Sequence, residues 1–133
     1  KIPTTLIVDS AVGITMSNGI VNKVIVGADR ITRTAVINKI GTFMIALAAK
    51  HHEIPFYSAA PTSTLDLAGK TTSTSIEERD PREVTEIRGK RIAPRGVKVF
   101  NPAFDSTPLE LVTAVITDQG IFSPEQIQNM TLT

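Results

Sequence analysis

Four side chains able to do acid–base or binding chemistry gather in one stretch, residues 26–42. Asp29 and Arg30 follow a short apolar run, and Asn38 and Lys39 come nine and ten residues after Asp29. A carboxyl group can give or take a proton, while an amide and an ammonium group can hold hydroxyl and phosphate groups. The stretch therefore predicts a site for a small polar or phosphorylated ligand.

The pattern of the neighbouring residues predicts where these side chains lie. Residues 23–28 are typical of a buried strand, so Asp29 is expected just past its carboxyl end, where ligands bind in open parallel sheets. From Asn38 the apolar period becomes helical, which predicts that Asn38 and Lys39 begin a helix ending near residues 50–52. The free N–H groups and the dipole at a helix start attract anions.

Each candidate also has a purely structural interpretation, which the sequence leaves open. Asp29 could cap the following turn or pair with Arg30. Asn38 is a common helix N-cap, and most lysines, such as Lys39, are simply solvated. Residues 62–64, Thr-Ser-Thr, supply hydroxyls after another strand but could equally be turn formers.

The elements that must hold the site alternate between apolar strands and helices. This alternation predicts an α/β fold with an open parallel sheet and helices on both faces. The expected strands are residues 4–8, 23–28, 54–60 and 97–100, and a short helix is expected over residues 11–18. Residues 61–96 are rich in turn-forming residues, so we expect loops there with short strands near residues 84–87 and 90–93.

Two further helix starts are predicted from capping boxes. Thr107, Pro108 and Glu110 have the spacing of an N-cap, N1 and N3, and that helix should end at Gly120. The segment "SPEQ", residues 123–126, repeats the same device.

Composition excludes several classes of protein. The 133 residues carry a net charge of +1, which gives no argument for nucleic acid or a membrane surface as partner. There is no cysteine, so disulfides, thiolate metal sites and a cysteine nucleophile are excluded within these residues, and a cytoplasmic location is the default expectation.

The adjacent His51 and His52 point in different directions on a helix, so we interpret them as surface or C-cap residues rather than metal ligands. The run from Glu77 to Asp80 is interpreted as a solvated or salt-bridged loop.

The ordered motifs "VIVGADRI", "NKIGTFMIALAAKHHEIPFY", "AAPTSTLD", "IEERDPREV" and "NPAFDSTP" resemble the C-terminal half of methylthioribose-1-phosphate isomerases. The wider superfamily includes regulatory subunits of translation initiation factor 2B and ribose-1,5-bisphosphate isomerases. Asp29 and Arg30 favour a sugar-phosphate isomerase, because the regulatory subunits typically carry Glu-Gly there. "AAPTSTLD", "IEERDP" and "NPAFDSTP" favour the methylthioribose branch, whereas "ITRTAVINKIG" is closer to the bisphosphate isomerases.

The resemblance implies a Rossmann-like catalytic domain over residues 1–133, from a cytoplasmic homodimeric enzyme of methionine salvage, part of methionine and amino-acid biosynthesis. Such enzymes convert 5-methylthioribose 1-phosphate to 5-methylthioribulose 1-phosphate, and no metal or organic cofactor is implied. Asp29 matches the family's acid, and Asn38 and Lys39 match residues that hold substrate hydroxyl and phosphate groups. An acid that donates a proton near neutral pH must be kept protonated, which burial in an apolar pocket favours.

The sequence departs from the family pattern in two respects. The family's second catalytic residue, a cysteine in an upstream segment, has no match here, nor have the upstream helical domain and the first strand–helix unit of the sheet. We therefore expect an incomplete sheet and a site that needs the upstream half. The turn between Asp29 and Asn38 is also one residue shorter than usual and contains no glycine, which restricts its accessible conformations.

Overall fold

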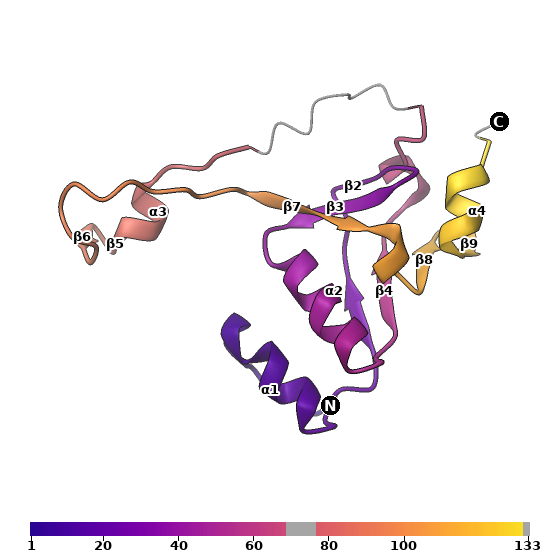
Figure 1. The fold of residues 1–133 in the computed structure, drawn as a ribbon, viewed down its shortest axis with the longest axis horizontal. Helices are drawn as coiled ribbons and strands as arrows, with labels where there is room; N and C mark the ends of the chain where they lie inside the picture. The colour runs from indigo at the N-terminus through magenta and orange to yellow at the C-terminus, as the bar shows by residue number, and fades with distance from the viewer. Residues whose placement is uncertain (69–76, 132–133) are drawn as a thin grey trace.

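The largest sheet of the chain confirms the α/β class. A computed structural model describes residues 1–68 and 77–131 (Figure 1). Its four-stranded sheet has the order β1–β4–β8–β9. β1 (Val24–Val26), β4 (Phe56–Ala59) and β8 (Ala114–Thr117) run parallel, while β9 (Gly120–Phe122) pairs antiparallel with β8. The carboxyl ends of β1, β4 and β8 therefore lie at one edge of the sheet. Parallel strands were predicted at β1 and β4, whereas β8 lies where a helix was expected.

A second, antiparallel sheet was not predicted. It consists of β2 (Arg30–Ile31), β3 (Ala35–Lys39) and β7 (Phe104–Pro108), in that order. β2 and β3 form a hairpin, and β3 pairs along its whole length with β7. This sheet brings residues near position 38 beside residues near position 105.

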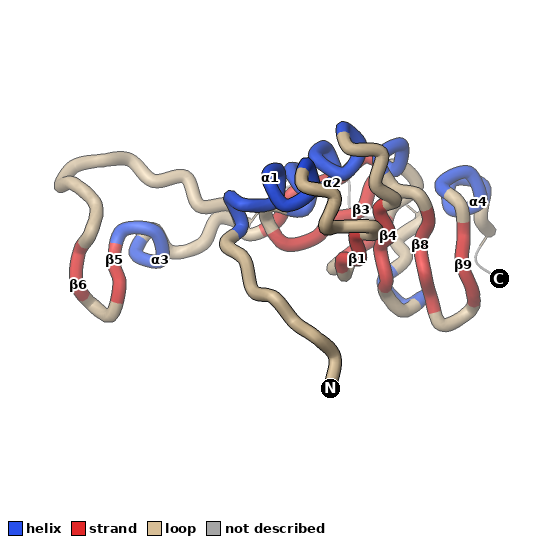
Figure 2. The backbone as a smooth tube through the Cα atoms, turned by 90° about the horizontal axis from the view of Figure 1, so that it is seen from below, coloured by secondary structure: helices blue, strands red, loops and turns tan. Residues whose placement is uncertain are grey.

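The helices lie mainly on one side of the four-stranded sheet (Figure 2). A 3-10 turn, η1 (Asp9–Ala11), leads into α1 (Val12–Ser17), which packs against α2 (Thr42–His51). α4 (Pro124–Asn129) contacts β8 and β9, and its predicted capping box is confirmed. No helix within residues 1–68 and 77–131 is long and apolar enough to cross a membrane.

Residues 77–103 form an arm that extends away from both sheets (Figure 1). It holds α3 (Arg82–Thr85), β5 (Glu86–Ile87) and β6 (Lys90–Arg91), which confirms the two short strands predicted there. The two ends of the arm are joined by hydrogen bonds from Arg79 N to Asn101 O and from Ala103 N to Glu77 O.

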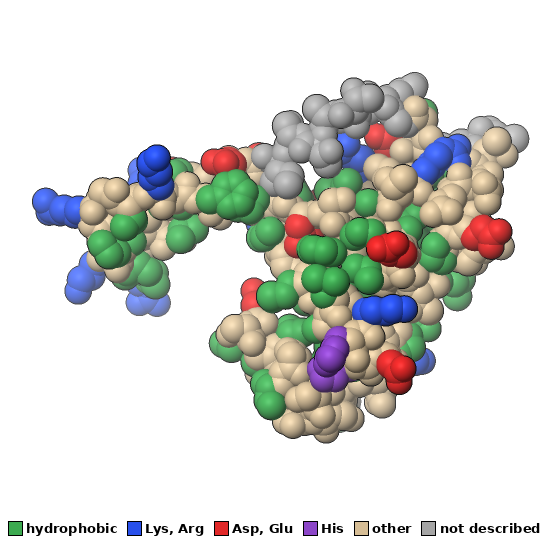
Figure 3. All heavy atoms as spheres, viewed as in Figure 1, with side chains coloured by type: hydrophobic (Ala, Val, Ile, Leu, Met, Phe, Trp, Pro, Cys, Tyr) green, Lys and Arg blue, Asp and Glu red, His purple; other side chains and the backbone are tan. Residues whose placement is uncertain are grey.

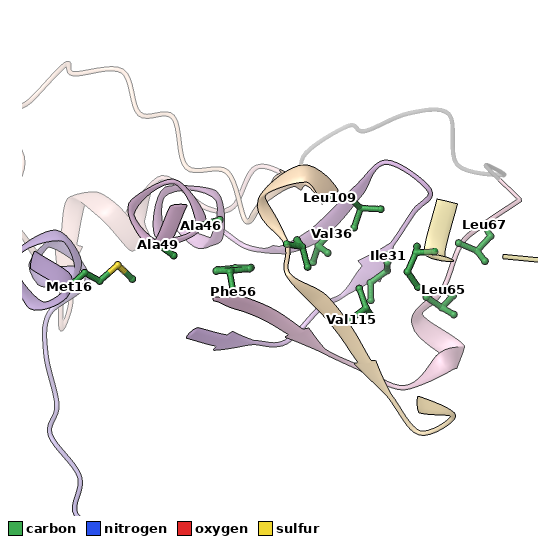
Figure 4. Packing of buried hydrophobic residues seen from close by; sticks show 12 residues of the cluster. Met16, Ile31, Val36, Ala46, Ala49, Phe56, Leu65, Leu67, Leu109 and Val115 are labelled. Carbon is green, nitrogen blue, oxygen red and sulfur yellow. The ribbon is translucent and has the colours of Figure 1, made fainter. Parts of the chain in front are cut away.

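The core lies between α2 and the two sheets (Figure 4). Phe56 of β4 points toward Ala46 and Ala49 of α2, and Val115 of β8 lies near Ile31 of the hairpin. The buried cluster also includes Met16, Val36, Leu65, Leu67, Leu109, Val112 and Ile127. It joins helices α1, α2 and α4 to strands of both sheets.

The helix predicted from residue 107 to residue 119 is wrong. This segment instead forms the end of β7, a 3-10 turn, η3 (Leu109–Leu111), and then β8. The Thr107 hydroxyl is buried and has no hydrogen-bond partner among the described residues, so it does not cap a helix. The β-branched residues of "VTAVIT" favour a strand, and pairing with β4 decides the outcome.

The strands predicted at residues 4–8 and 97–100 are also wrong. Both segments are irregular, and Leu6 and Phe100 are 95% and 74% exposed. An apolar run forms a strand only where a neighbouring strand supplies hydrogen-bond partners. Among the described residues neither segment has such a neighbour.

Candidate functional site

Asp29 lies beyond the carboxyl end of β1, as predicted, and its side chain is exposed. Its N–H donates to the carbonyl of Ile37 at 2.9 Å, while Arg30 is the residue that pairs with Ile37 in the register of β2 and β3. This hydrogen bond holds Asp29 beside β3, directly before the first residue of β2.

The hairpin of β2 and β3 brings Asp29 and Asn38 together without a glycine in its turn. Thr32 N donates to Ala35 O at 2.9 Å, and the Thr32 hydroxyl accepts from the N–H groups of Thr34 and Ala35 at 3.2 and 3.0 Å. No residue of this turn has a positive φ. The hydrogen bonds to the Thr32 hydroxyl therefore stabilise this tight turn, in which a glycine is more usual.

Arg33, at the tip of this hairpin, is a residue that the sequence analysis missed. Its guanidinium donates to the carbonyls of Leu67 at 2.9 Å, Met130 at 2.9 Å and Gln128. It thus fixes the hairpin to the C-terminal end of α4. No local pattern signals such a contact, because the acceptors are backbone atoms far away in the sequence.

Asn38 and Lys39 do not begin a helix; they are the last two residues of β3. α2 begins at Thr42 after an N-cap at Gly41, whose φ of 102° lies in the left-handed region that glycine adopts readily. Ile40 lies before the helix but has the same spacing of four and three residues to Met44 and Leu47 as residues within it. For this reason the sequence pattern places the helix start too early. The prediction of Asn38 as an N-cap is therefore wrong.

The side chain of Asn38 connects β3 to the start of α2. Its Nδ2 donates to the Thr42 hydroxyl at 3.0 Å, and that hydroxyl donates to the carbonyl of Lys39 at 2.7 Å. A methyl group added at Gly27 would lie 4.0 Å from Asn38 Oδ1, so the end of β1 is also close. Asn38 is half-buried and Lys39 is exposed, which leaves the Lys39 ammonium group open to a ligand.

The first N–H groups of α2 are occupied by Asp105, a residue of β7. Gly41 N donates to Asp105 Oδ2 at 2.8 Å, and Phe43 N lies 3.1 Å from the same oxygen. The prediction that these N–H groups are free to attract an anionic ligand is wrong, because a carboxylate of the chain itself already accepts from them. Asp105 lies within β7, directly opposite Asn38 of β3.

The loop after β4 meets the end of β8 at the same edge of the sheet. It includes the 3-10 turn η2 (Thr62–Thr64). Thr62 N donates to Asp118 Oδ1 at 2.6 Å and the Thr62 hydroxyl donates to Oδ2 at 3.2 Å. The first of these bonds is the main reason that the pKa of the Asp118 carboxyl is lowered. Thr62 is thus engaged within the fold, which supports its interpretation as a turn former.

The remaining charged candidates have structural partners. Arg79 pairs with Glu83 at 2.7 Å and Arg82 with Asp80 at 2.6 Å, which confirms a salt-bridged segment. Both pairs are exposed, and hydrogen bonds from the arginines lower the pKa of Asp80 and Glu83.

The histidines also occupy the structural positions expected of them. His52 is the C-cap of α2, and its ring lies edge-on to that of His51. Over residues 1–68 and 77–131, no group of three or more histidine and acidic residues could hold a metal ion.

Comparison with known proteins identifies relatives over nearly all of these residues. A family described as "Initiation factor 2 subunit family" matches residues 1–124. A methylthioribose-1-phosphate isomerase from Thermosipho africanus is 56% identical over 131 residues, which are 97% of the chain and 38% of that protein. The chain spans 36% to 38% of the length of such curated relatives.

Two solved structures share the fold. A structure titled translation initiation factor eIF-2B, subunit delta, from A. fulgidus aligns with a TM-score of 0.87 at 56% identity, covering 92% of this chain and 36% of that one. A 5-methylthioribose 1-phosphate isomerase from Pyrococcus horikoshii OT3 aligns with a TM-score of 0.83 at 47% identity, covering 90% and 34%. The two titles name different functions for very similar folds.

Proposed function

The chain belongs to the initiation factor 2 subunit family, and from this premise we propose that it is the C-terminal part of an aldose–ketose isomerase. The reaction would convert 5-methylthioribose 1-phosphate to 5-methylthioribulose 1-phosphate in methionine salvage. The observation that carries the proposal is the approach of Asp29 and Asn38 at the end of β1, with Lys39 next to Asn38 at the end of β3, in residues 56% identical to part of an isomerase.

Each residue has a role in this proposal. Asp29 donates a proton to the ring oxygen, so that the ring can open although the anomeric phosphate blocks ordinary opening. Hydrogen then moves from C2 to C1. The amide of Asn38 and the ammonium group of Lys39 hold the hydroxyl and phosphate groups, with no metal or organic cofactor. Asp29 is exposed among these residues, so other parts of the protein must cover it during the reaction.

We propose that residues 1–133 are a Rossmann-like catalytic domain within a longer chain, whose upstream half adds the second catalytic residue. Two features support an additional protein surface here. β1 is an edge strand of its sheet. Ile40, just before α2, and Phe43, Met44 and Leu47 within it, here called the α2 stripe, are 37% to 50% exposed. Figure 3 shows hydrophobic side chains exposed over α2. Exposed apolar surface of this kind is typical of protein contacts.

We also propose that the full-length protein is a homodimer, and the α2 stripe could form part of its interface. Leu109, Val112 and Val115 are buried in the core, so they are not available for a dimer interface. We propose a cytoplasmic location, with neither nucleic acid nor a membrane as a partner.

The second candidate is a non-catalytic regulatory subunit. The likeness to the structure titled as an initiation factor subunit favours it, at a TM-score of 0.87. In that case Asp29 would line a pocket that binds a sugar phosphate or nucleotide as an effector. A third candidate, ribose-1,5-bisphosphate isomerase, differs only in its substrate.

The test is an isomerase assay on the full-length protein that carries these residues. We expect turnover of 5-methylthioribose 1-phosphate and little of ribose 1,5-bisphosphate. The opposite preference would favour the third candidate, and no turnover of either would favour the regulatory subunit. The isolated residues 1–133 should be inactive, and substantial activity from them would contradict the shared site.

A further inference from the structure

We infer that Asp105 is the positioning residue for the substrate-binding pair Asn38 and Lys39. The inference rests on the proposed function, and it adds to that function a residue from a distant strand. Asp105 touches no proposed substrate atom. It acts through the turn that joins β3 to α2.

The carboxylate of Asp105 holds this turn at two points. Oδ2 accepts from Gly41 N at 2.8 Å and from Phe43 N at 3.1 Å, and Oδ1 lies 3.2 Å from Phe43 N. Hydrogen bonds to an ionised acceptor are stronger than neutral ones. A turn through a left-handed glycine is otherwise flexible, so this anchor limits its conformations.

The backbone of the same strand fixes the pair directly. In the register of β3 and β7, Asn38 lies opposite Asp105 and Lys39 opposite Phe104. Ile40 N then donates to Ala103 O at 3.0 Å. The pairing of β3 with β7 and the carboxylate of Asp105 therefore both fix the segment from Asn38 to Phe43, and both come from β7.

A continuous set of contacts leads from the anchored turn to the binding groups. Between Gly41 and Phe43, the Thr42 hydroxyl donates to Lys39 O at 2.7 Å and accepts from Asn38 Nδ2 at 3.0 Å. A shift of the turn would thus move the Asn38 amide and redirect Lys39. Because Asp105 already accepts from Gly41 N and Phe43 N, Lys39 is the residue of the pair that supplies positive charge to the substrate phosphate.

The test uses steady-state kinetics of the full-length protein. Asp105→Ala should raise KM about tenfold with a smaller change in kcat, because it weakens binding groups rather than the acid. Asp105→Asn should keep KM near the wild-type value, since an amide oxygen can still accept from both N–H groups. Adding Asp105→Ala to Lys39→Ala should raise KM less than it does in the wild-type background, because the two residues act through one contact.

Ser123→Ala is the matched control, because it removes a cap from another helix start. It should lower Tm without changing KM. If Asp105→Ala does not fold, Asp105→Ser replaces it, since a serine hydroxyl is too short to reach both N–H groups. A wild-type KM in Asp105→Ala or Asp105→Ser, with an active parent enzyme, would overturn the inference. An inactive parent would instead overturn the proposed function.

Discussion

At the starts of α2 and α4, side chains accept hydrogen bonds from two backbone N–H groups each, but the acceptors come from different places. At α4, Ser123 accepts from Gln126 N at 3.2 Å, and the Gln126 side chain accepts from Ser123 N at 2.8 Å. At α2, the acceptor is Asp105, on a strand more than sixty residues further along the chain. The start of α4 can form with its own helix, whereas the start of α2 requires the antiparallel sheet to be assembled.

This difference indicates what fixes the positions of the proposed binding residues. Asn38 and Lys39 end a strand that is held by β7, so their position depends on the tertiary fold rather than on a local motif. Sites built on paired elements are more precise than sites on free loops. Four changes test the binding residues beside α2, the start of α4, the contact of Arg33 that joins them, and the neighbouring contact of Asp118.

The largest expected effect is at Lys39. Lys39→Ala should raise KM about 10- to 100-fold, because a charge-assisted hydrogen bond to phosphate contributes about 1.5–3 kcal/mol. Glu125→Ala, in the first turn of α4, is the counterpart and should leave KM unchanged. Equal effects of the two changes on KM in the full-length enzyme would contradict a binding role for Lys39 at the end of β3.

Arg33 joins the two regions, so its removal should disturb both. Arg33→Ala breaks three contacts to backbone carbonyls and should cost about 2 kcal/mol of stability. Hydrogen exchange in the full-length protein should accelerate at residues 126–130 and in the hairpin. Arg33→Lys should restore only part of the protection, because an ammonium group lacks the planar fork. Unchanged exchange at residues 126–130 would show that the hairpin does not hold α4.

A smaller effect is expected at the locally capped helix. Ser123→Ala should destabilise α4 by about 1 kcal/mol, since it removes one half of a capping box. The change should be confined to α4 and its contacts with β8 and β9. Altered exchange at residues 38–43 would contradict the independence of the two helix starts.

The smallest effect is expected on the stability of the fold at low pH, through the contact between Thr62 and Asp118. The pKa of Asp118 is lowered mainly by the N–H of Thr62, so this contact contributes stability above the unfolded pKa, about 3.9. That contribution is lost as the pH falls through the lower, folded pKa. Asp118→Asn should therefore flatten the loss of stability below about pH 4. An unchanged acid limb in a thermal melt would contradict the contact.

The sequence predicted secondary structure correctly where residues close together in the chain determine it. The strands at Val24 and Phe56 and the α4 capping box were predicted correctly, because apolar runs and cap spacing are local signals. The segment from Thr107 to Gly120 shows the limit. It carries the spacing of a capping box, but pairing of β7 with β3 and of β8 with β4 is more favourable than a helix.

The same limit applies to the site. Asp29 was placed correctly at the end of a strand, because the strand before it is a clear pattern. The contacts of Arg33 and Asp105 join residues more than thirty positions apart, and no periodicity reports them. The roles proposed for Asp29, Asn38 and Lys39 depend on such contacts as much as on the residues themselves.

The central claim is that Asp29 is the acid of an isomerase, and one substitution in the full-length protein tests it most directly. Asp29→Asn keeps the size of the side chain and removes its exchangeable carboxyl proton. We expect kcat for 5-methylthioribose 1-phosphate to fall about 10²- to 10⁴-fold, with the melting temperature and sugar-phosphate binding preserved. Wild-type turnover by a folded Asp29→Asn variant would contradict the account.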